Sequence, residues 1–203
     1  MGRAALAIAG MALIGIGVAI GVGWWWPSRA DAEARLTQPI RTVRIDAVSS
    51  TVRIRTADGS ATTVHEHFGY HGRSRPGDTF RVEGDQLVLP PCGNSCSTDY
   101  DVTVPRGTAV TGSTTSGVIR LQGTGPVDVS ATSGDVDVTL TDPQNVRVRT
   151  TSGAIRLFVP HDRYQVTGDS TSGERRIDAA TDPSSPHLLE LTTTSGDVTV
   201  RER

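Results

Sequence analysis

The second half of this sequence repeats the tripeptide Thr-Ser-Gly five times, at intervals of 17 to 23 residues. Self-similarity at a period of about 20 residues is the sequence signature of stacked structural units. A residue set that recurs five times is typical of a scaffold rather than of five active sites, so we interpret these residues as structural corners. The five copies are Thr115-Ser116-Gly117, Thr132-Ser133-Gly134, Thr151-Ser152-Gly153, Thr171-Ser172-Gly173 and Thr194-Ser195-Gly196.

Apolar and polar residues alternate on both sides of each tripeptide. In the second unit, Val127 and Val129 lie seven and five residues before the glycine, and Val136 and Val138 lie two and four residues after it. This alternation predicts half-buried strands, and the change of parity at the glycine predicts a bend between two of them. Each unit is too thin to bury its own apolar face, so stacking must bury it. We therefore predict an all-β fold, a β-solenoid or β-helix-like stack of two-strand repeats about 4.8 Å apart.

The amino terminus carries an uncharged apolar run over residues 4–26, which is 23 residues long. A membrane span needs about 20 such residues, and Trp24, Trp25 and Trp26 at its end resemble an interfacial aromatic belt. We predict that residues 1–26 form one N-terminal transmembrane anchor (or an uncleaved signal), placing a single-pass protein in the cell membrane with its C-terminal domain extracytoplasmic. The alternative is secretion after cleavage near Ala32.

The remainder divides by regularity. Residues 27–39 are polar and predict a linker, residues 40–104 predict degenerate N-terminal β coils, and residues 105–203 hold the five repeats. The fourth repeat is irregular because the charged run 174–176, Glu-Arg-Arg, interrupts its alternation. We interpret it as a degenerate coil or local loop, with a basic contact patch as the alternative.

Composition excludes several function classes. A net charge of −2 gives no electrostatic case for nucleic-acid binding. All 20 basic residues are arginine, a bias that suggests a bacterial genome rich in G and C, and the lack of lysine excludes a P-loop lysine, a Schiff-base lysine and a Ser-Lys dyad. Nor does the sequence contain a Gly-x-Ser-x-Gly elbow. We expect no catalytic residue, no cofactor and no enzymatic activity.

Two small groups could carry site chemistry. Cys92 and Cys96 are the only cysteines, and we predict a disulfide as the default in an oxidising compartment. A metal pair would need two more ligands, and a redox site would have another spacing. His65, His67 and His71 form the one metal-like cluster, although a solvated polar face explains them better and we expect no metal site.

The first repeat is preceded by Val-Pro-Arg-Gly at 104–107. The repeats then read Thr-Thr-Ser-Gly-Val-Ile-Arg-Leu at 114–121 and Ala-Thr-Ser-Gly-Asp-Val-Asp-Val at 131–138. This pattern resembles the bacterial "putative adhesin" family, also catalogued as domain of unknown function 4097, the β-strand-repeat proteins. The resemblance covers about Ile40 to Arg201. It implies a cell-surface β-solenoid with no known catalytic residues.

Together these observations predict a membrane-anchored, non-catalytic, adhesin-like binding module whose partner is a cell-envelope glycan or protein. One alternative is an envelope-stress or signalling accessory protein that works through its membrane helix. A glycan-acting enzyme is less favoured, because it would need paired acidic residues converging in a groove.

Overall fold

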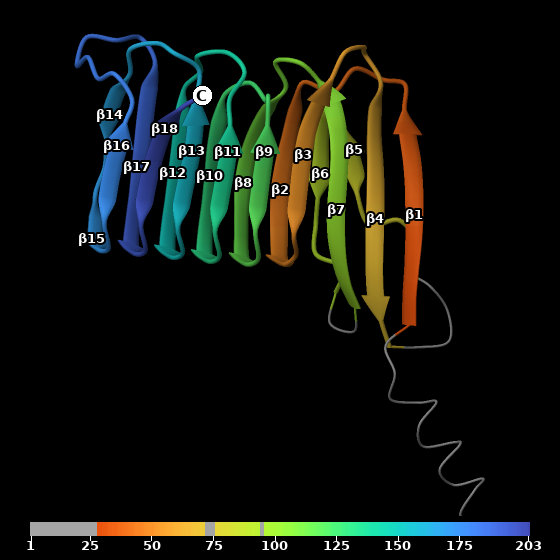
Figure 1. Cartoon of the computed structure of the whole chain (residues 1–203). Helices are drawn as coiled ribbons and strands as arrows, with labels where there is room; N and C mark the ends of the chain where they lie inside the picture. Colours follow the sequence, from red (N-terminus) through yellow and green to blue (C-terminus); the bar gives the residue numbers. More distant parts are fainter. Residues whose placement is uncertain (1–27, 72–75, 94–95) are drawn as a thin grey trace, which may run out of the picture.

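The computed structural model describes residues 28–71, 76–93 and 96–203, so the predicted membrane segment at 4–26 lies outside the described residues (Figure 1). The described residues form 18 strands in two large sheets. Among them, no helix has the length and apolar character needed to cross a bilayer. The prediction of an all-β fold is confirmed.

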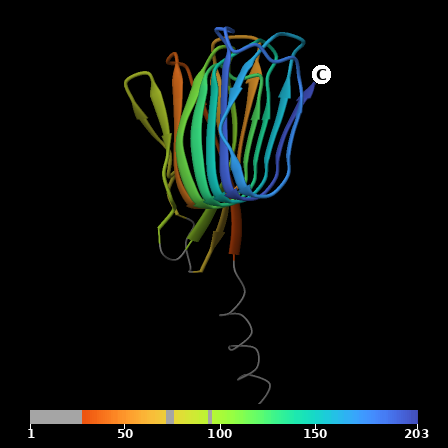
Figure 2. The same cartoon turned by 90° about the vertical axis from the view of Figure 1, so that its left-hand side faces the viewer.

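The repeats form parallel rungs. In each rung a first strand runs to a corner, which is Thr-Ser-Gly in the repeats, and a second strand returns in the opposite sheet, which Figure 2 shows end-on. The five regular rungs, each given as first and second strand, are β2 (Thr42–Ser49) and β3 (Val52–Ala57), β8 (Ala109–Ser116) and β9 (Ile119–Gln122), β10 (Val127–Ser133) and β11 (Val136–Thr139), β12 (Val146–Ser152) and β13 (Ile155–Val159), and β17 (Leu188–Ser195) and β18 (Val198–Glu202).

The predicted in-and-out alternation sets the core. The second strands pair in register, so that Val136 lies between Ile119 and Ile155, and all three side chains are fully buried. The same holds for the first strands, where Val127 lies between Val110 and Val146. Because each rung alone exposes these side chains, the apolar area buried between rungs is the main stabilising contribution, at about 25 cal/mol per Å².

The corners lie in a row along one edge of the stack (Figure 1). A Cβ atom added to Gly134 would lie 1.7 Å from the carbonyl oxygen of Gly117, and one added to Gly117 would lie 2.0 Å from that of Ser50. Glycine recurs because neighbouring backbones leave no space for a side chain. Ser50 marks a sixth corner that carries no Thr-Ser-Gly, and the carboxylate of Asp99 accepts a hydrogen bond (2.7 Å) from the amide of Thr51 beside it.

The spatial order of the rungs differs from their order in the chain. The last rung of the sequence, β17 and β18, is inserted next to β12 and β13, and the fourth repeat lies outside it as the terminal rung. The terminal rung consists of β14 (Gln165–Thr167), β15 (Ser170–Ser172) and β16 (Arg175–Asp178). Among the described residues no further rung stacks on its outer side, so an irregular sequence is tolerated there: Arg175 takes an inward register position opposite buried Val198, yet it is exposed.

The N-terminal end is built differently. Beside β2 and β3 lies one more parallel rung, and the sheet of second strands is then extended by two antiparallel strands. Residues 28–36, which we expected to belong to a linker, instead form β1, because small residues alternate there with charged ones and line one side of the strand. The elements of this end are β1 (Ser28–Leu36), β4 (Thr62–Tyr70), β5 (Arg81–Glu83), β6 (Gln86–Leu89) and β7 (Cys96–Pro105).

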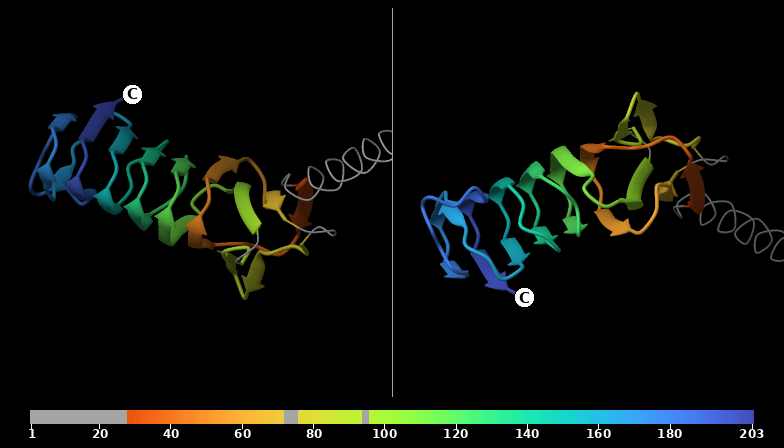
Figure 3. Two further views of the ribbon diagram at one scale, coloured as in Figure 1. Left: turned by 90° about the horizontal axis from the view of Figure 1, so that it is seen from below. Right: turned by 90° about the horizontal axis from the view of Figure 1, so that it is seen from above.

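We call the sheet β1-β4-β7-β3-β9-β11-β13-β18-β16 sheet A, and the sheet that runs from β14 through β17, β12, β10, β8, β2 and β6 to β5 sheet B. Figure 3 shows the two sheets as opposite long sides of the stack in its C-terminal part. Each sheet turns one face to the core and the other to solvent, so the outer faces are two long walls.

Candidate functional site

The outer wall of sheet A carries a row of charged side chains that pair with one another. Arg53 lies 3.5 Å from Asp101 on the neighbouring strand, and Arg156 contacts both Asp137 (3.1 Å) and Asp135 (2.9 Å). Burial alone raises the pKa of Asp135, but the amide of Ala154 and the Arg156 guanidinium outweigh it, so this pKa lies below its ordinary value. The arginines of this row therefore have carboxylate partners on their own or neighbouring rungs.

A groove of about 690 Å³ lies beside this row, at the carboxyl ends of the strands of sheet A. One register row crosses it from strand to strand: Arg55 pairs with Gln122, Gln122 with Thr139, and Thr139 with Phe158. Its lining comes from five strands, from three loop residues and from Arg203, which follows β18. The lining residues are Arg55, Thr56, Arg106, Gln122, Gly123, Thr139, Thr141, Phe158, Glu202 and Arg203.

The charged side chains in the groove are mostly cationic. Arg55, Arg106 and Arg203 line it, against the single carboxylate of Glu202. That carboxylate is already engaged, since one oxygen lies 2.9 Å from Nδ1 of His161 and the other accepts a hydrogen bond (3.1 Å) from the amide of Ala180. These two contacts lower the pKa of Glu202.

Sequence reasoning did not single out this groove. Its central residues Gln122, Thr139 and Phe158 each lie five residues after a repeat glycine, at a solvent-facing position where the residue type differs from unit to unit. The signal that could have found the groove is that the residue type varies at this one position of the repeat. We considered only the positions at which the same residue type recurs.

The predicted histidine cluster is only partly brought together. His65 and His67 lie on β4, where His67 bridges two carboxylates, with Nδ1 2.7 Å from Asp31 on β1 and Nε2 3.1 Å from Asp101 on β7. The hydrogen bond with Asp31 is the main reason that the pKa of His67 is raised. His71 follows the end of β4, and no metal-binding group of three or more suitable side chains occurs among the described residues.

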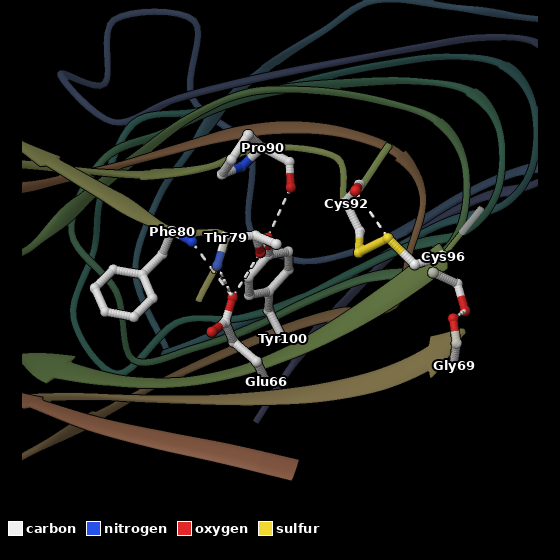
Figure 4. The surroundings of a disulfide bond; sticks show 9 residues. Glu66, Gly69, Thr79, Phe80, Pro90, Cys92, Cys96 and Tyr100 are labelled. Carbon is white, nitrogen blue, oxygen red and sulfur yellow. Dashed lines mark hydrogen bonds between the residues drawn. A yellow bond between two sulfur atoms is a disulfide. The ribbon is translucent and has the colours of Figure 1, made fainter. Parts of the chain in front are cut away.

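The predicted disulfide is present and joins Cys92 to Cys96, whose Cα atoms lie 5.6 Å apart (Figure 4). Near it in Figure 4, the buried carboxylate of Glu66 accepts hydrogen bonds from the amide (2.9 Å) and the hydroxyl (2.6 Å) of Thr79. The hydroxyl of Tyr100 donates to the carbonyl of Pro90 (2.7 Å). This network fixes the 76–80 loop against sheet A and has a structural role.

The aspartates that follow two of the repeat glycines also have a structural role. The carboxylate of Asp135 accepts a hydrogen bond from the amide of Ala154 in the next rung, and that of Asp197 accepts one from the amide of Glu174, both at 2.9 Å. Asp99 of β7, which accepts a hydrogen bond from Thr51 at the Ser50 corner, acts in the same way. All three carboxylates join one rung to the next at the edge of the stack. The charged run that we interpreted as a degenerate coil or local loop, with a basic contact patch as the alternative, places Arg175 and Arg176 exposed on the terminal rung.

Parallel two-strand rungs enclosing one apolar interior define the chain as a β-solenoid with two outer walls. The model of the Toastrack DUF4097 family matches residues 93–201, which is more than half of the sequence. The chain therefore belongs to the Toastrack DUF4097 family.

The chain is similar to solved structures, of which the first named here shares its fold. A "putative cell adhesion protein" from Clostridium sporogenes is 12% identical, with a TM-score of 0.63 over 87% of this chain and 100% of that one. A "putative adhesin" from Bacteroides fragilis is 11% identical, with a TM-score of 0.38 over 88% of this chain and 99% of that one. No curated protein matches the sequence.

Proposed function

We propose that this protein is a non-catalytic binding module that attaches to cell-envelope material from outside the cytoplasm. The observation that carries the proposal is the outer wall of sheet A, a preformed surface held by in-register rungs, with one groove that gathers cationic, hydroxyl and aromatic side chains. A rigid wall of this kind loses little conformational entropy when a long partner binds.

Two further observations support the proposal. Asp135 and Asp137 on this wall are engaged by Arg156, which suits a recognition surface better than general acid-base chemistry. The similar structure from Clostridium sporogenes is described as a cell adhesion protein. The uncharged segment at 4–26 would hold the module in the cell membrane as a single span.

A retention experiment tests this function. The purified full-length chain, kept in detergent because of the predicted span, is mixed with washed bacterial cell envelopes, pelleted and quantified. We expect retention that saturates with protein concentration and that a heat-denatured sample of the same chain does not show. The proposed function would be refuted if the native protein stayed in the supernatant, with none retained by the envelopes, at every concentration tested.

A further inference from the structure

The groove on sheet A has the shape of a channel for a chain rather than of a pocket for a small molecule. Its register row continues from Phe158 to Arg201 on β18, so four steps of one strand spacing separate Arg55 from Arg201. At about 4.8 Å per step the row is about 19 Å long and runs along the axis of the stack. A linear polymer lying along that axis would meet each strand in turn.

We infer that this groove binds a linear saccharide or polyol polymer that carries anionic groups, with Arg55 and Arg106 contacting the anions and Phe158 supporting the backbone of the polymer. The inference rests on the proposed envelope-binding function and names the class of ligand and the site that takes it. The anionic groups are carboxylates or phosphodiesters, which the test below separates.

The charge of the groove is the first argument. Among the described residues, no carboxylate lies within the 4.0 Å ion-pair limit of Arg55, whose Nε donates only to the hydroxyl of Thr103 (3.2 Å). The neighbouring register row differs, because Arg53, Arg120 and Arg156 all have carboxylate partners. The charges of the arginines beside the groove are thus neutralised by carboxylates, whereas Arg55 within the groove keeps its positive charge uncompensated. A free guanidinium offers the planar fork of donors that fits carboxylates and phosphates.

Arg106 adds a second cation at the same end. It projects from the turn after β7 and lies 2.8 Å from Asp58, and both side chains are exposed. An exposed ion pair of this kind contributes little to stability, about 0–1 kcal/mol. Its guanidinium can therefore exchange a water-facing position for contact with an anionic ligand at small cost.

The aromatic and neutral polar residues are the second argument. Phe158 is half-buried, so one part of its ring packs on the wall and another part faces the groove. Thr139 is its register neighbour, and Gln122 follows on the next strand. An apolar ring beside hydroxyl and amide groups matches the two faces of a sugar or polyol unit, whose C–H groups and hydroxyls need different partners.

The floor of the groove is the third argument. Gly123 adopts a left-handed conformation (φ 70°), and an added Cβ atom would lie 2.5 Å from Oγ1 of Thr56 and 3.3 Å from Cγ2 of Thr141. Thr56 near the end of β3 and Thr141 in the loop after β11 therefore place small hydroxyl residues on either side of Gly123. This keeps the floor low and lined with hydrogen-bonding groups.

Binding of the full-length chain in detergent to three soluble polymers tests the inference: polygalacturonate, polyglycerol phosphate and neutral dextran. We expect one or both anionic polymers to bind, weakening as salt rises, and dextran to bind at least tenfold more weakly. Arg55→Gln and Phe158→Ala should each weaken anionic binding by roughly tenfold, the usual consequence of losing one charge-assisted or aromatic contact. Arg44→Gln, on the outer face of sheet B, is the matched control and should bind as the native chain does.

The outcomes separate cleanly. Preference for polygalacturonate identifies a carboxylated ligand, and preference for polyglycerol phosphate identifies a phosphodiester. The inference is overturned if neither anionic polymer binds, if dextran binds equally well, if a single-stranded oligonucleotide binds more tightly than both, or if Arg55→Gln behaves like Arg44→Gln. If envelopes still retain the chain in any of those cases, the proposed function stands and only the site or ligand class is wrong.

Discussion

The row of corner glycines makes a strong prediction for Gly134→Ala. A Cβ atom at this position would lie 1.7 Å from the carbonyl oxygen of Gly117, and real Cβ contacts essentially never fall below 3.0 Å. The shortfall, 3.0 minus 1.7, is 1.3 Å, and the atom to be moved belongs to the backbone of the neighbouring rung. The two rungs must therefore separate locally, because no rotation of a side chain relieves the clash.

The cost follows from the bonds that this separation strains. The amide of Gly117 donates to the carbonyl of Ser133 (3.1 Å), and that of Ile119 donates to the carbonyl of Asp135 (3.0 Å), so both bonds join the two rungs that the clash drives apart. Losing two such bonds costs about 2 kcal/mol, and overpacking adds about 1–3 kcal/mol. We expect the free energy of unfolding to fall by about 3–5 kcal/mol, a large share of the 5–15 kcal/mol typical of a domain.

Urea unfolding of the full-length chain, followed by far-ultraviolet circular dichroism, measures this loss. Gly77→Ala is the matched control, because a Cβ atom there meets nothing within 4 Å. Gly173→Ala should cost less than Gly134→Ala even though its Cβ atom would lie 2.1 Å from the carbonyl oxygen of Gly196, since the terminal rung can shift outward. If Gly134→Ala and Gly77→Ala differed by less than about 0.5 kcal/mol, the close stacking of corners would be refuted.

Three further predictions concern the ends of the stack. The pKa of His67 is raised above 6.5, so the stabilisation that protonated His67 gives to the docking of β1 should be complete below pH 6.5 and decline as pH rises through the folded-state pKa. Hydrogen exchange of the β1 amides, corrected for intrinsic rates, should show this pH dependence. If His67→Ala showed the same pH dependence as the native chain, the prediction would be contradicted. Glu66→Ala should destabilise by about 2–4 kcal/mol, since it leaves the amide and hydroxyl of Thr79 without their acceptor, whereas Glu66→Gln should cost less; equal melting temperatures for the two variants would argue against this role. Arg175→Val places an apolar residue at the inward position of the terminal rung and should cause concentration-dependent association in sedimentation velocity, whereas Arg120→Val on the outer wall should not. If Arg175→Val stayed monomeric at all concentrations, Arg175 would not be what keeps the exposed sheet edges from pairing with a second copy.

The repeat itself could be predicted because its signal is local. Alternation around Gly134 places Val136 and Val138 on one face, and the same offsets recur in the other units, so register is fixed by self-similarity. The corner glycines could likewise be recognised, since a bend with positive φ, here 146° to 158°, favours glycine in every unit. The Cys92–Cys96 disulfide followed from the presence of two cysteines alone.

Other parts of the fold could not be predicted because they depend on long-range pairing. The alternation of Ala30, Ala32 and Ala34 with charged residues was legible, but small alanines are equally typical of a polar linker, and only pairing with β4 makes this segment a strand. The corner at Ser50 escaped notice because it carries no Thr-Ser-Gly, and because its hydrogen bond to the neighbouring rung is accepted by Asp99, which lies 48 residues from Thr51 in sequence. The role of His67 depends on Asp31 and Asp101, which lie 36 and 34 residues away in sequence.

The insertion of the last rung is what assembles the groove. If the rungs stacked in chain order, β16 would lie beside β13, and Asp178, which shares a register position with Arg201, would be the neighbour of Phe158. The groove would then lose Glu202 and Arg203 and have a carboxylate at the end where the structure has arginines. Placing β18 there instead keeps the charged, irregular fourth repeat at the exposed end of the stack, where its inward Arg175 costs little. One change of order therefore protects the edge of the sheets and keeps the wall of sheet A cationic at both ends of its groove.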